Sequence, residues 1–563
     1  MEDNYDAIVV GTGVSGGWAA KELCEKGLKT LVLERGRMIK HNEDYTTAND
    51  DHWDYPVGDV ITQEIKKNQP KQSRTRYVNS ESTKHLFVDD NEHPYNETKR
   101  FDWIRGYHVG GRSLTWGRQV YRLSDFDFEA NFKEEIAVDW PIRYKDIAPW
   151  YDYVEEYIGI SGEKLNLPQL PDGKFLKPMD MYCVEEDLKK SLATKYEDRL
   201  LTIGRVAHIT EGSKPGLGRA SCQYRNRCRR GCPFGAYFSS NSSTLPAAEA
   251  TGNMTLRPNS VVHEVIYDPI KKRATGVRVI DSETQEVFEY NAKVIFLCAS
   301  TVPTTSILMQ SKSDRFPNGM GNDSGELGHN IMDHHLGVGA SGVSGSHKDK
   351  YFTGRRPNGI YLPRYRNLGG KTNRKDFLRG YGYQGGGSRG IWRDYSKEMA
   401  YGSEIKKAIL EPGDWGMNLG GFGEILPYHE NKMALDYNKL DKWGLPTVTF
   451  DASIFENEIN MRKDMKQQAE EMLNAAGFKN VKGYDRGYTI GLGIHEMGTA
   501  RMGRDSKTSV LNKNNQLHSV PNVYVTDGSA MTSAGCTNPS ITYMALTARA
   551  ANHAVNELKK MNL

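Results

Sequence analysis

The chain has 563 residues, a formal net charge of +3 and seven cysteines. A charge so close to zero argues against a nucleic-acid partner. The lack of any apolar run near ~18 residues argues against a membrane helix, and an odd number of scattered cysteines argues against a disulfide framework. The first residues carry no basic segment followed by an apolar one, so we expect no signal peptide. This favours the cytoplasm, or the periplasm if a partner carries the folded chain across a membrane.

A strand, a glycine-rich turn and a helix are predicted at the start of the chain. Residues 6–10 form a short apolar run typical of a buried strand, and Gly11, Gly13 and Gly16 follow as G-x-G-x-x-G. Gly11 would make the turn, Gly13 would let a pyrophosphate approach, and Gly16 would let helix and strand pack closely. A second strand ends in Glu34, which can accept hydrogen bonds from ribose hydroxyls. This context favours a dinucleotide site over a structural turn, without separating FAD from NAD.

Two later stretches favour FAD. The first, residues 105–122, contains Gly106, Gly110 and Gly111, whose backbone can lie against a flavin or a phosphate. The second is a predicted strand that ends at Asp527 and Gly528, where a carboxylate could bind the hydroxyls of the cofactor. An ordinary Asp-Gly turn is the alternative for that pair.

Three cysteines lie within eleven residues, as Cys222, Cys228 and Cys232. Zinc prefers four ligands and no fourth is near in sequence, and a disulfide would leave one cysteine over. A 3Fe–4S cluster fits three thiolates, while reduced thiols with no redox role remain the alternative. The cluster's negative charge would be partly offset by Arg225, Arg227, Arg229 and Arg230. The other cysteines are expected to be structural: Cys24, Cys183, Cys298 and Cys536.

Two polar residues near the end of the chain are candidates for catalysis. His495 lies in the mostly uncharged, glycine-bounded stretch GLGIHEMGTARMG, and Asn538 precedes Pro539 at a predicted helix start. A lone histidine is often structural, and an asparagine at this place can simply cap the helix. Residue type alone therefore leaves both roles open.

Several motifs occur in an order that resembles the glucose–methanol–choline (GMC) family of FAD-dependent alcohol oxidoreductases. They are GGRSLTWG, VIFLCASTVPTTSILMQS, GELGHNIMDHH, HEMGTARMG and TNPSITYMALTARA. The resemblance implies that His495 is the catalytic base and Asn538 its partner, with Val262 and Pro539 near the cofactor. The cysteine segment is similar to one branch, the large subunits of gluconate 2-dehydrogenase, fructose dehydrogenase and glucoside 3-dehydrogenase. Some members attach FAD through a histidine where this chain has Thr115, and His108 lies nearby, so we expect non-covalent FAD.

The resemblance also implies the fold: an α/β (α+β) protein in which a Rossmann-like FAD-binding domain is interleaved with a substrate domain built on an antiparallel sheet. The FAD-binding domain would comprise residues 1–45, 75–135, 195–335 and 500–563. The substrate domain would comprise residues 136–194 and 336–499. Glu424 and His429 are possible pocket residues of the second domain, with a surface-loop location equally open.

The expected activity is the oxidation of a secondary alcohol of a sugar or glycoside, with C3 of a pyranoside preferred. A gluconate 2-dehydrogenase-type reaction is the near alternative, and a redox-inactive flavin-binding subunit is a remoter one. Electrons would pass through the 3Fe–4S cluster to an external acceptor. The branch implies a small subunit and a cytochrome c-type acceptor as partners.

Overall fold

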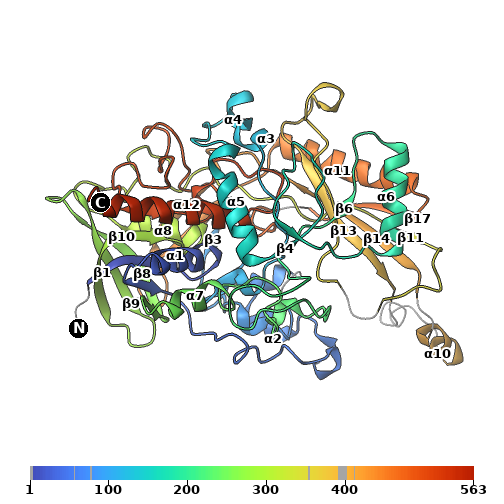
Figure 1. The fold of residues 1–563 in the computed structure, drawn as a ribbon, viewed down its shortest axis with the longest axis horizontal. Helices are drawn as coiled ribbons and strands as arrows, with labels where there is room; N and C mark the ends of the chain where they lie inside the picture. The colour runs from blue at the N-terminus through green and yellow to red at the C-terminus, as the bar shows by residue number, and fades with distance from the viewer. Residues whose placement is uncertain are drawn as a thin grey trace.

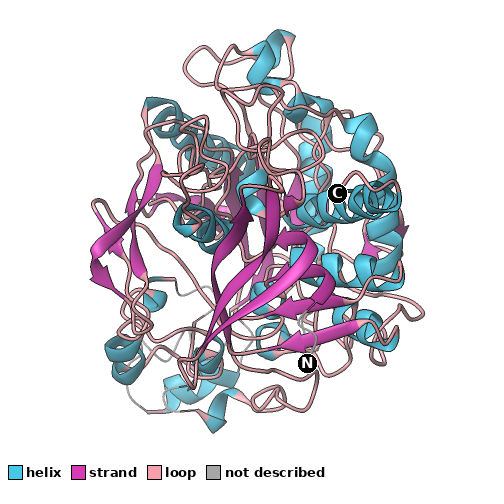
Figure 2. Cartoon of the chain, turned by 90° about the vertical axis from the view of Figure 1, so that its left-hand side faces the viewer, coloured by secondary structure: helices cyan, strands magenta, loops and turns pink. Residues whose placement is uncertain are grey.

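The computed structural model describes residues 4–55, 58–75, 79–352, 356–390, 402–410, 413–487 and 489–563. A mixed sheet and an antiparallel sheet lie toward opposite ends of the longest axis, and both termini lie at the end of the mixed sheet (Figure 1). Helices flank the strands (Figure 2). The predicted fold class, with a Rossmann-like part and an antiparallel part, is confirmed.

The mixed sheet has seven strands in the order β7-β2-β1-β10-β9-β8, with β18 also paired to β10. Its parallel strands are β1 (Asn4–Val10), β2 (Thr30–Leu33), β7 (Met254–Arg257), part of β10 (Val287–Leu297) and β18 (Val523–Val525). The antiparallel strands are β8 (Ser260–Asp268) and β9 (Arg273–Asp281). Helices α1 (Val14–Glu25), α7 (Thr244–Ala250) and α12 (Ser540–Lys559) pack together beside this sheet. Parallel strands covered in this way read as continuous apolar runs, as residues 7–10 do.

The antiparallel sheet has six strands in the order β17-β11-β14-β13-β12-β6. They are β6 (Thr202–Ile203), β11 (Val338–Ser344), β12 (Ile360–Leu362), β13 (Tyr381–Arg389), β14 (Trp415–Gly423) and β17 (Lys479–Asp485). Helices α6 (Cys183–Lys195) and α11 (Glu456–Ala475) pack against it through apolar side chains. Because strand side chains alternate, the residues between the helix-facing ones are free to line a site on the opposite face.

A third, smaller sheet joins β15 (Lys432–Leu440), β16 (Pro446–Asp451) and β3 (Asn96–Glu97). Two short strands cross the predicted domain ranges: β3 pairs with a strand from the 336–499 range, and β6 joins the antiparallel sheet although it lies in the 195–335 range. The domain boundaries themselves stay a prediction. Helix α10 (Ser403–Leu410) lies apart from the body of the molecule (Figure 1).

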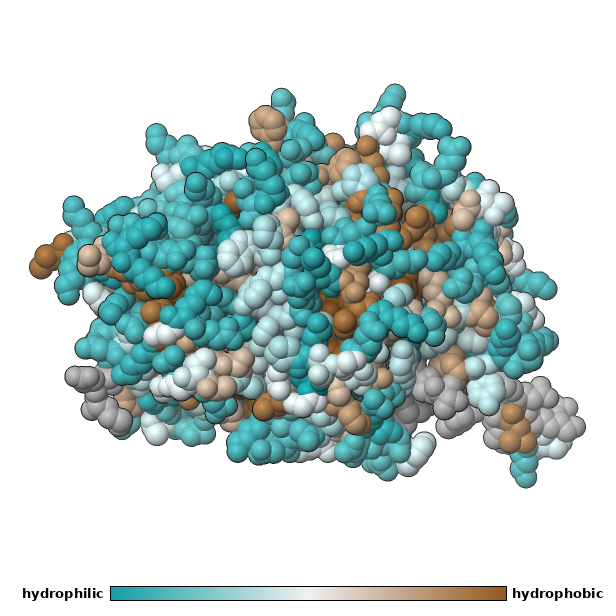
Figure 3. Space-filling view, viewed as in Figure 1, coloured by the Kyte–Doolittle hydropathy of each residue, from teal (hydrophilic) through white to brown (hydrophobic). Residues whose placement is uncertain are grey.

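The face seen in Figure 3 is largely hydrophilic, with scattered apolar side chains. Within the described residues, no helix combines the length and the apolar character needed to cross a bilayer.

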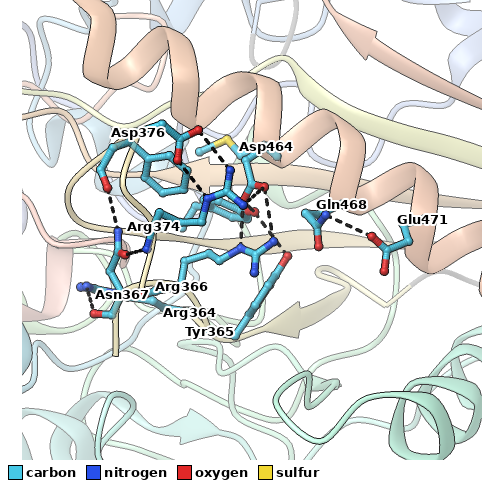
Figure 4. A network of polar contacts seen from close by, with 12 residues as sticks. Arg364, Tyr365, Arg366, Asn367, Arg374, Asp376, Asp464, Gln468 and Glu471 are labelled. Carbon is cyan, nitrogen blue, oxygen red and sulfur yellow. Dashed lines mark hydrogen bonds and ion pairs between the residues drawn. The ribbon is translucent and has the colours of Figure 1, made fainter. Parts of the chain in front are cut away.

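A buried polar network ties helix α11 to the antiparallel sheet (Figure 4). Asp464 of α11 accepts hydrogen bonds from Arg366, at 2.9 and 3.3 Å, and from the hydroxyl of Tyr381. Arg374 lies 3.7 Å from the same carboxylate. Hydrogen bonds to an ionised, buried acceptor are stronger than neutral ones. The network therefore fixes the helix on one face of the sheet and leaves the other face to the cavity.

Candidate active site

A cavity of about 360 Å³ lies where the two large sheets meet. Its lining includes residues that follow β1, β2 and β10, together with Gln384 of β13 and Phe422 of β14. Ligands of open α/β sheets bind at the carboxyl ends of the parallel strands, and this cavity lies there.

The glycine turn forms one wall of the cavity. A Cβ atom on Gly16 would lie 1.9 Å from the carbonyl oxygen of Gly11, so only glycine lets α1 approach β1 this closely. A Cβ on Gly13 would meet nothing within 4 Å, and Gly13 lines the cavity. Gly111 also lines it, beside Gly13, whereas Gly110 packs against Asn241 outside it. The turn thus offers bare backbone to a ligand, next to the positive end of a helix.

Glu34 lines the same end of the cavity. Its carboxylate accepts hydrogen bonds from the backbone N–H of Thr12 at 3.1 Å, the hydroxyl of Thr12 at 2.5 Å and the N–H of Gly36 at 3.0 Å. Burial raises the pKa of Glu34, and these hydrogen bonds act in the opposite direction. The position of the carboxylate is therefore fixed before any ligand binds.

Replacing Glu34 by arginine should weaken the retention of FAD, because a cation would replace the acceptor at this wall. The fraction of flavin that stays with the protein through gel filtration measures the effect. Glu43→Arg is the matched control, since the Glu43 side chain is 70% exposed and lies outside the cavity lining. Equal retention in the two variants would argue against a role of Glu34 in cofactor binding.

Three further predicted cofactor residues line the cavity: Val262, Asp527 and Gly528. Asp527 accepts hydrogen bonds from the hydroxyls of Thr304, at 2.5 Å, and Ser529, at 2.6 Å. Burial raises its pKa. Its carboxylate also caps a short 3-10 turn. Asp527 therefore forms an Asp-Gly turn and lines the cavity at the same time.

Thr115 lines the cavity and His108 does not. His108 is buried, and its Nδ1 lies 3.1 Å from the carbonyl oxygen of Val109. Thr115 thus lies at the cavity where some members of the resembling family carry the histidine that links FAD. This agrees with the expectation of non-covalent FAD.

The loop before His495 is held in a strained conformation. Ile494 has φ +63°, in the left-handed region that a β-branched residue rarely occupies. The carboxylate of Asp333 accepts the backbone N–H groups of Gly491 at 2.7 Å, Gly493 at 2.9 Å and His495 at 3.0 Å. Strain of this kind persists only where the surroundings enforce it, and Asp333 supplies that constraint.

Replacing Asp333 by alanine should lower the free energy of unfolding by roughly 3 kcal/mol, because three N–H groups lose an ionised acceptor. Urea unfolding measures the change. Asp323→Ala is the control: it removes only an exposed ion pair with Arg315 and should cost less than about 1 kcal/mol. Equal effects in the two variants would show that Asp333 does not fix the loop.

The surroundings of the His495 ring favour its neutral form. The ring lines the cavity, lies edge-on to His334 with centroids 5.1 Å apart, and is near Phe422. Burial, together with the nearby His334 and Arg112, lowers the pKa of His495 well below its usual value. A neutral imidazole facing the cavity can accept a proton.

Asn538 also lines the cavity, and its Oδ1 accepts a hydrogen bond from Nε2 of Gln384 at 2.6 Å. Pro539 is the N-cap of α12 and lies outside the cavity lining. No side chain caps this helix, so Asn538 is not a capping residue. Its amide nitrogen is the group left for a ligand oxygen. The sequence gives no signal for Gln384, because a polar residue in a glycine-rich strand does not reveal which face of the sheet it lies on.

Glu424 and His429 do not line the cavity, so the expectation of pocket residues there is wrong. Glu424 is 1% exposed and lies 3.7 Å from the guanidinium of Arg379. The side chain of His429 is 57% exposed and contacts Glu326. Both side chains contact charged residues that are distant in sequence, Arg379 for Glu424 and Glu326 for His429.

The three clustered cysteines line a second, smaller cavity. All three thiols are free. Burial raises the pKa of the Cys222 thiol to about 11, and the nearby guanidinium of Arg118 acts in the opposite direction. Burial likewise raises the pKa of Cys228, against Arg118 and Arg229.

Three of the four arginines predicted to offset the cluster charge bind a neighbouring loop, and two of them, Arg225 and Arg227, also line the small cavity. Arg225 donates to Asn49, Arg227 pairs with Asp51, and Arg230 pairs with Asp59 at 2.8 Å. The charge of Arg118 also acts on the thiols of Cys222 and Cys228, and nothing in the sequence indicates this role. The chain fold brings Arg118 there from a segment about 100 residues earlier.

A thin wall separates the two cavities. Trp116, Gly117 and Gln119 line the larger cavity, while Arg118 between them acts on the thiols of the smaller one. Asn358 lines the larger cavity, and its neighbour Pro357 lines the smaller. Asn358 also donates to the carbonyl oxygen of Gly117 at 2.9 Å.

A Rossmann-type sheet, a glycine turn and a long cavity roofed by an antiparallel sheet define an FAD-binding oxidoreductase. Two family models described as GMC oxidoreductase match residues 211–336 and 427–547. The chain therefore matches both the N-terminal and the C-terminal domain of the GMC oxidoreductase family.

Similar proteins cover nearly the whole chain. A 2-methyl-1,2-propanediol dehydrogenase of Mycolicibacterium austroafricanum is 27% identical, over 98% of this chain and 95% of that protein. A fructose dehydrogenase large subunit of Gluconobacter japonicus is 24% identical, over 99% and 98%. Among solved structures, an Aspergillus oryzae formate oxidase has a TM-score of 0.62 at 15% identity and covers 99% of both chains. These likenesses agree with the fold described above.

Proposed function

We propose that the chain is a dehydrogenase with non-covalent FAD that oxidises a secondary alcohol of a sugar or polyol. The observation that carries this proposal is that His495 and Asn538 line the same cavity as Glu34 and the glycine turn. The His495 ring lies near Phe422 of β14, and Asn538 is held by Gln384 of the adjacent strand β13. A nucleotide held by Glu34 and the glycine turn would place its redox-active part in this shared cavity. Bound FAD supplies the hydride acceptor for the carbinol C–H bond.

In this proposal His495 takes the hydroxyl proton of the alcohol. Its lowered pKa keeps the imidazole neutral at ordinary pH, so the base is ready before the substrate binds. The amide of Asn538 donates a hydrogen bond to the same oxygen as negative charge develops there. Gln384 holds Asn538 by its carbonyl oxygen and so directs the amide nitrogen toward the substrate.

Replacing Asn538 by alanine should lower turnover on the order of 10²-fold, as for the loss of one preorganised donor. Asn538→Asp keeps the oxygen that Gln384 contacts and removes the donor, so its loss should be at least as large. Rates of flavin reduction at saturating substrate measure both. Full activity of the aspartate variant would show that donation by Asn538 is not needed.

The polar lining of the cavity suits a polyhydroxylated substrate. Three amide side chains line the cavity from separate segments: Gln119, Asn358 and Gln384. An amide side chain can both donate and accept hydrogen bonds, and so can each hydroxyl group of a sugar. We prefer C3 of a pyranoside as the position oxidised, with a sugar acid such as gluconate as the alternative.

The cysteine segment would carry electrons onward. Cys222, Cys228 and Cys232 would hold a 3Fe–4S cluster, which supplies a one-electron relay between a two-electron donor and an external acceptor. The thin wall at Arg118 supports this, because the thiols lie next to the cavity that would hold the flavin. We further propose a small subunit and a cytochrome c-type protein as partners. The similarity to a fructose dehydrogenase large subunit supports an assembly of this kind.

Stopped-flow measurement of flavin bleaching tests the proposed activity. Anaerobic protein is mixed with glucosides, gluconate, simple polyols and a 3-deoxy glucoside. Bleaching by the glucoside and not by its 3-deoxy analogue would support C3, and bleaching by gluconate alone would support the alternative. A protein that holds FAD and is bleached by none of them would favour a redox-inactive flavin-binding subunit.

A further inference from the structure

A buried histidine shares the small cavity with the three cysteines. His208 lines this cavity with Cys222, Cys228 and Cys232, and it is 1% exposed. Neither Nδ1 nor Nε2 of its ring has a hydrogen-bond partner. Its backbone forms an antiparallel bridge with Tyr237, and the two rings lie near each other, with centroids 5.9 Å apart. A buried imidazole of this kind normally has a partner, and its absence points to a group that the cavity would hold.

The set of three cysteines and one histidine resembles a zinc site in composition, but its spacing does not fit one. Zinc–sulfur bonds are about 2.3 Å long, so two sulfurs on one ion lie at most about 4.6 Å apart. Over the ranges that the structure describes, the sole set of three or more potential ligands with atoms within 4.8 Å of one another is Asp333, His334 and His495. No three ligand atoms of the cysteine and histidine set are therefore close enough for one zinc ion. The ligands of a cluster bind different irons and do not need to lie that close together.

The hydrogen-bonding capacity of the His208 ring indicates how it would interact with such a cluster. An imidazole carries at least one ring N–H in either protonation state. The thiolates and sulfides of a cluster are the acceptors that this N–H lacks. Arg118 already places a positive charge near Cys222 and Cys228, and a ring N–H donated by His208 would add to the same effect.

We propose that His208 donates a ring N–H hydrogen bond to a sulfur of the iron–sulfur cluster bound by Cys222, Cys228 and Cys232, without itself binding iron. This inference rests on the proposed relay. A hydrogen bond to cluster sulfur stabilises the more negative, reduced form. His208 therefore raises the reduction potential of the cluster and makes it a better acceptor of electrons from the flavin side.

The reduction potential of the cluster tests the role of His208 without depending on turnover. A redox titration of the anaerobic holoprotein is followed by the EPR signal of the oxidised cluster. His208→Leu should shift the reduction equilibrium at least tenfold toward the oxidised form, which is 59 mV for one electron. His208→Gln keeps an N–H donor and should recover much of the shift. Gln223→Ala is the control, because Gln223 lines the same cavity but donates outward to Ser221.

Pulsed EPR of the wild-type protein gives a second readout if a variant fails to fold. A hydrogen-bonded His208 should give an exchangeable proton coupling and a weak nitrogen coupling. Strong nitrogen coupling with four irons per FAD would make His208 an iron ligand and overturn the inference. Unchanged potentials in both variants, or no exchangeable proton coupling, would also overturn it while leaving the relay intact. Wild-type protein without iron would overturn the relay and this inference together.

Discussion

Replacing His495 by alanine should lower turnover by about 10² to 10⁴-fold while FAD stays bound, because a positioned general base contributes an effect of that size. The step affected is substrate-dependent flavin reduction, which stopped-flow absorbance measures directly. His335→Ala is a matched control, since His335 is a buried histidine near His334 that does not line the cavity. It should leave the rate of flavin reduction largely unchanged once the folded fraction is taken into account.

The pH dependence gives His495 a separate signature. A base works in its deprotonated form, which predominates at every pH above its pKa. Burial beside His334 and Arg112 lowers the pKa of His495 well below 6.5. The rate of flavin reduction at low substrate should therefore stay level as the pH falls through 6.5 and should decline only at more acidic pH. A decline centred at pH 6.5 or above, or an alanine variant with the wild-type rate, would contradict the assignment.

Replacing Cys228 by serine should remove the iron and abolish electron transfer to an external acceptor, while substrate still bleaches the flavin. The two half-reactions separate because hydride removal depends on the His495 end of the larger cavity, and the thiols line the other side of the wall at Arg118. Iron analysis measures the iron content, the EPR signal of the oxidised cluster shows whether the cluster is present, and single-turnover absorbance measures flavin reduction by substrate. Wild-type protein should contain about three irons per FAD.

Cys183→Ser is the control for this experiment, because Cys183 is a free cysteine outside the small cavity. It should keep both the iron and the transfer of electrons. A structural metal would behave differently, since its loss should unfold the segment and damage both half-reactions. Zinc in protein prepared anaerobically with ample iron, or a disulfide between two of the three cysteines, would contradict the relay.

Local patterns were enough to predict that the glycine turn, Glu34 and Asp527 share one cavity. The glycine turn, Glu34 and Asp527 each follow a strand, and the end of a parallel strand fixes where its next residues lie. The same reasoning failed for Glu424, because the path of a loop after its strand depends on distant partners such as Arg379. It also missed Arg118 and His208, which share a site with the cysteines only after the chain has folded.

The sequence alone determined the fold class, the nucleotide turn, the family resemblance and the cysteine spacing, because each depends on residues that are close together along the chain. The tertiary structure decided which side chains meet. It brought Gln384 to Asn538 across 154 residues and fixed the loop of His495 through Asp333, 162 residues earlier. It also placed the cysteine cavity against the wall of the flavin cavity. Such contacts depend on how two sheets pack against each other, and no periodicity within either sheet encodes that arrangement.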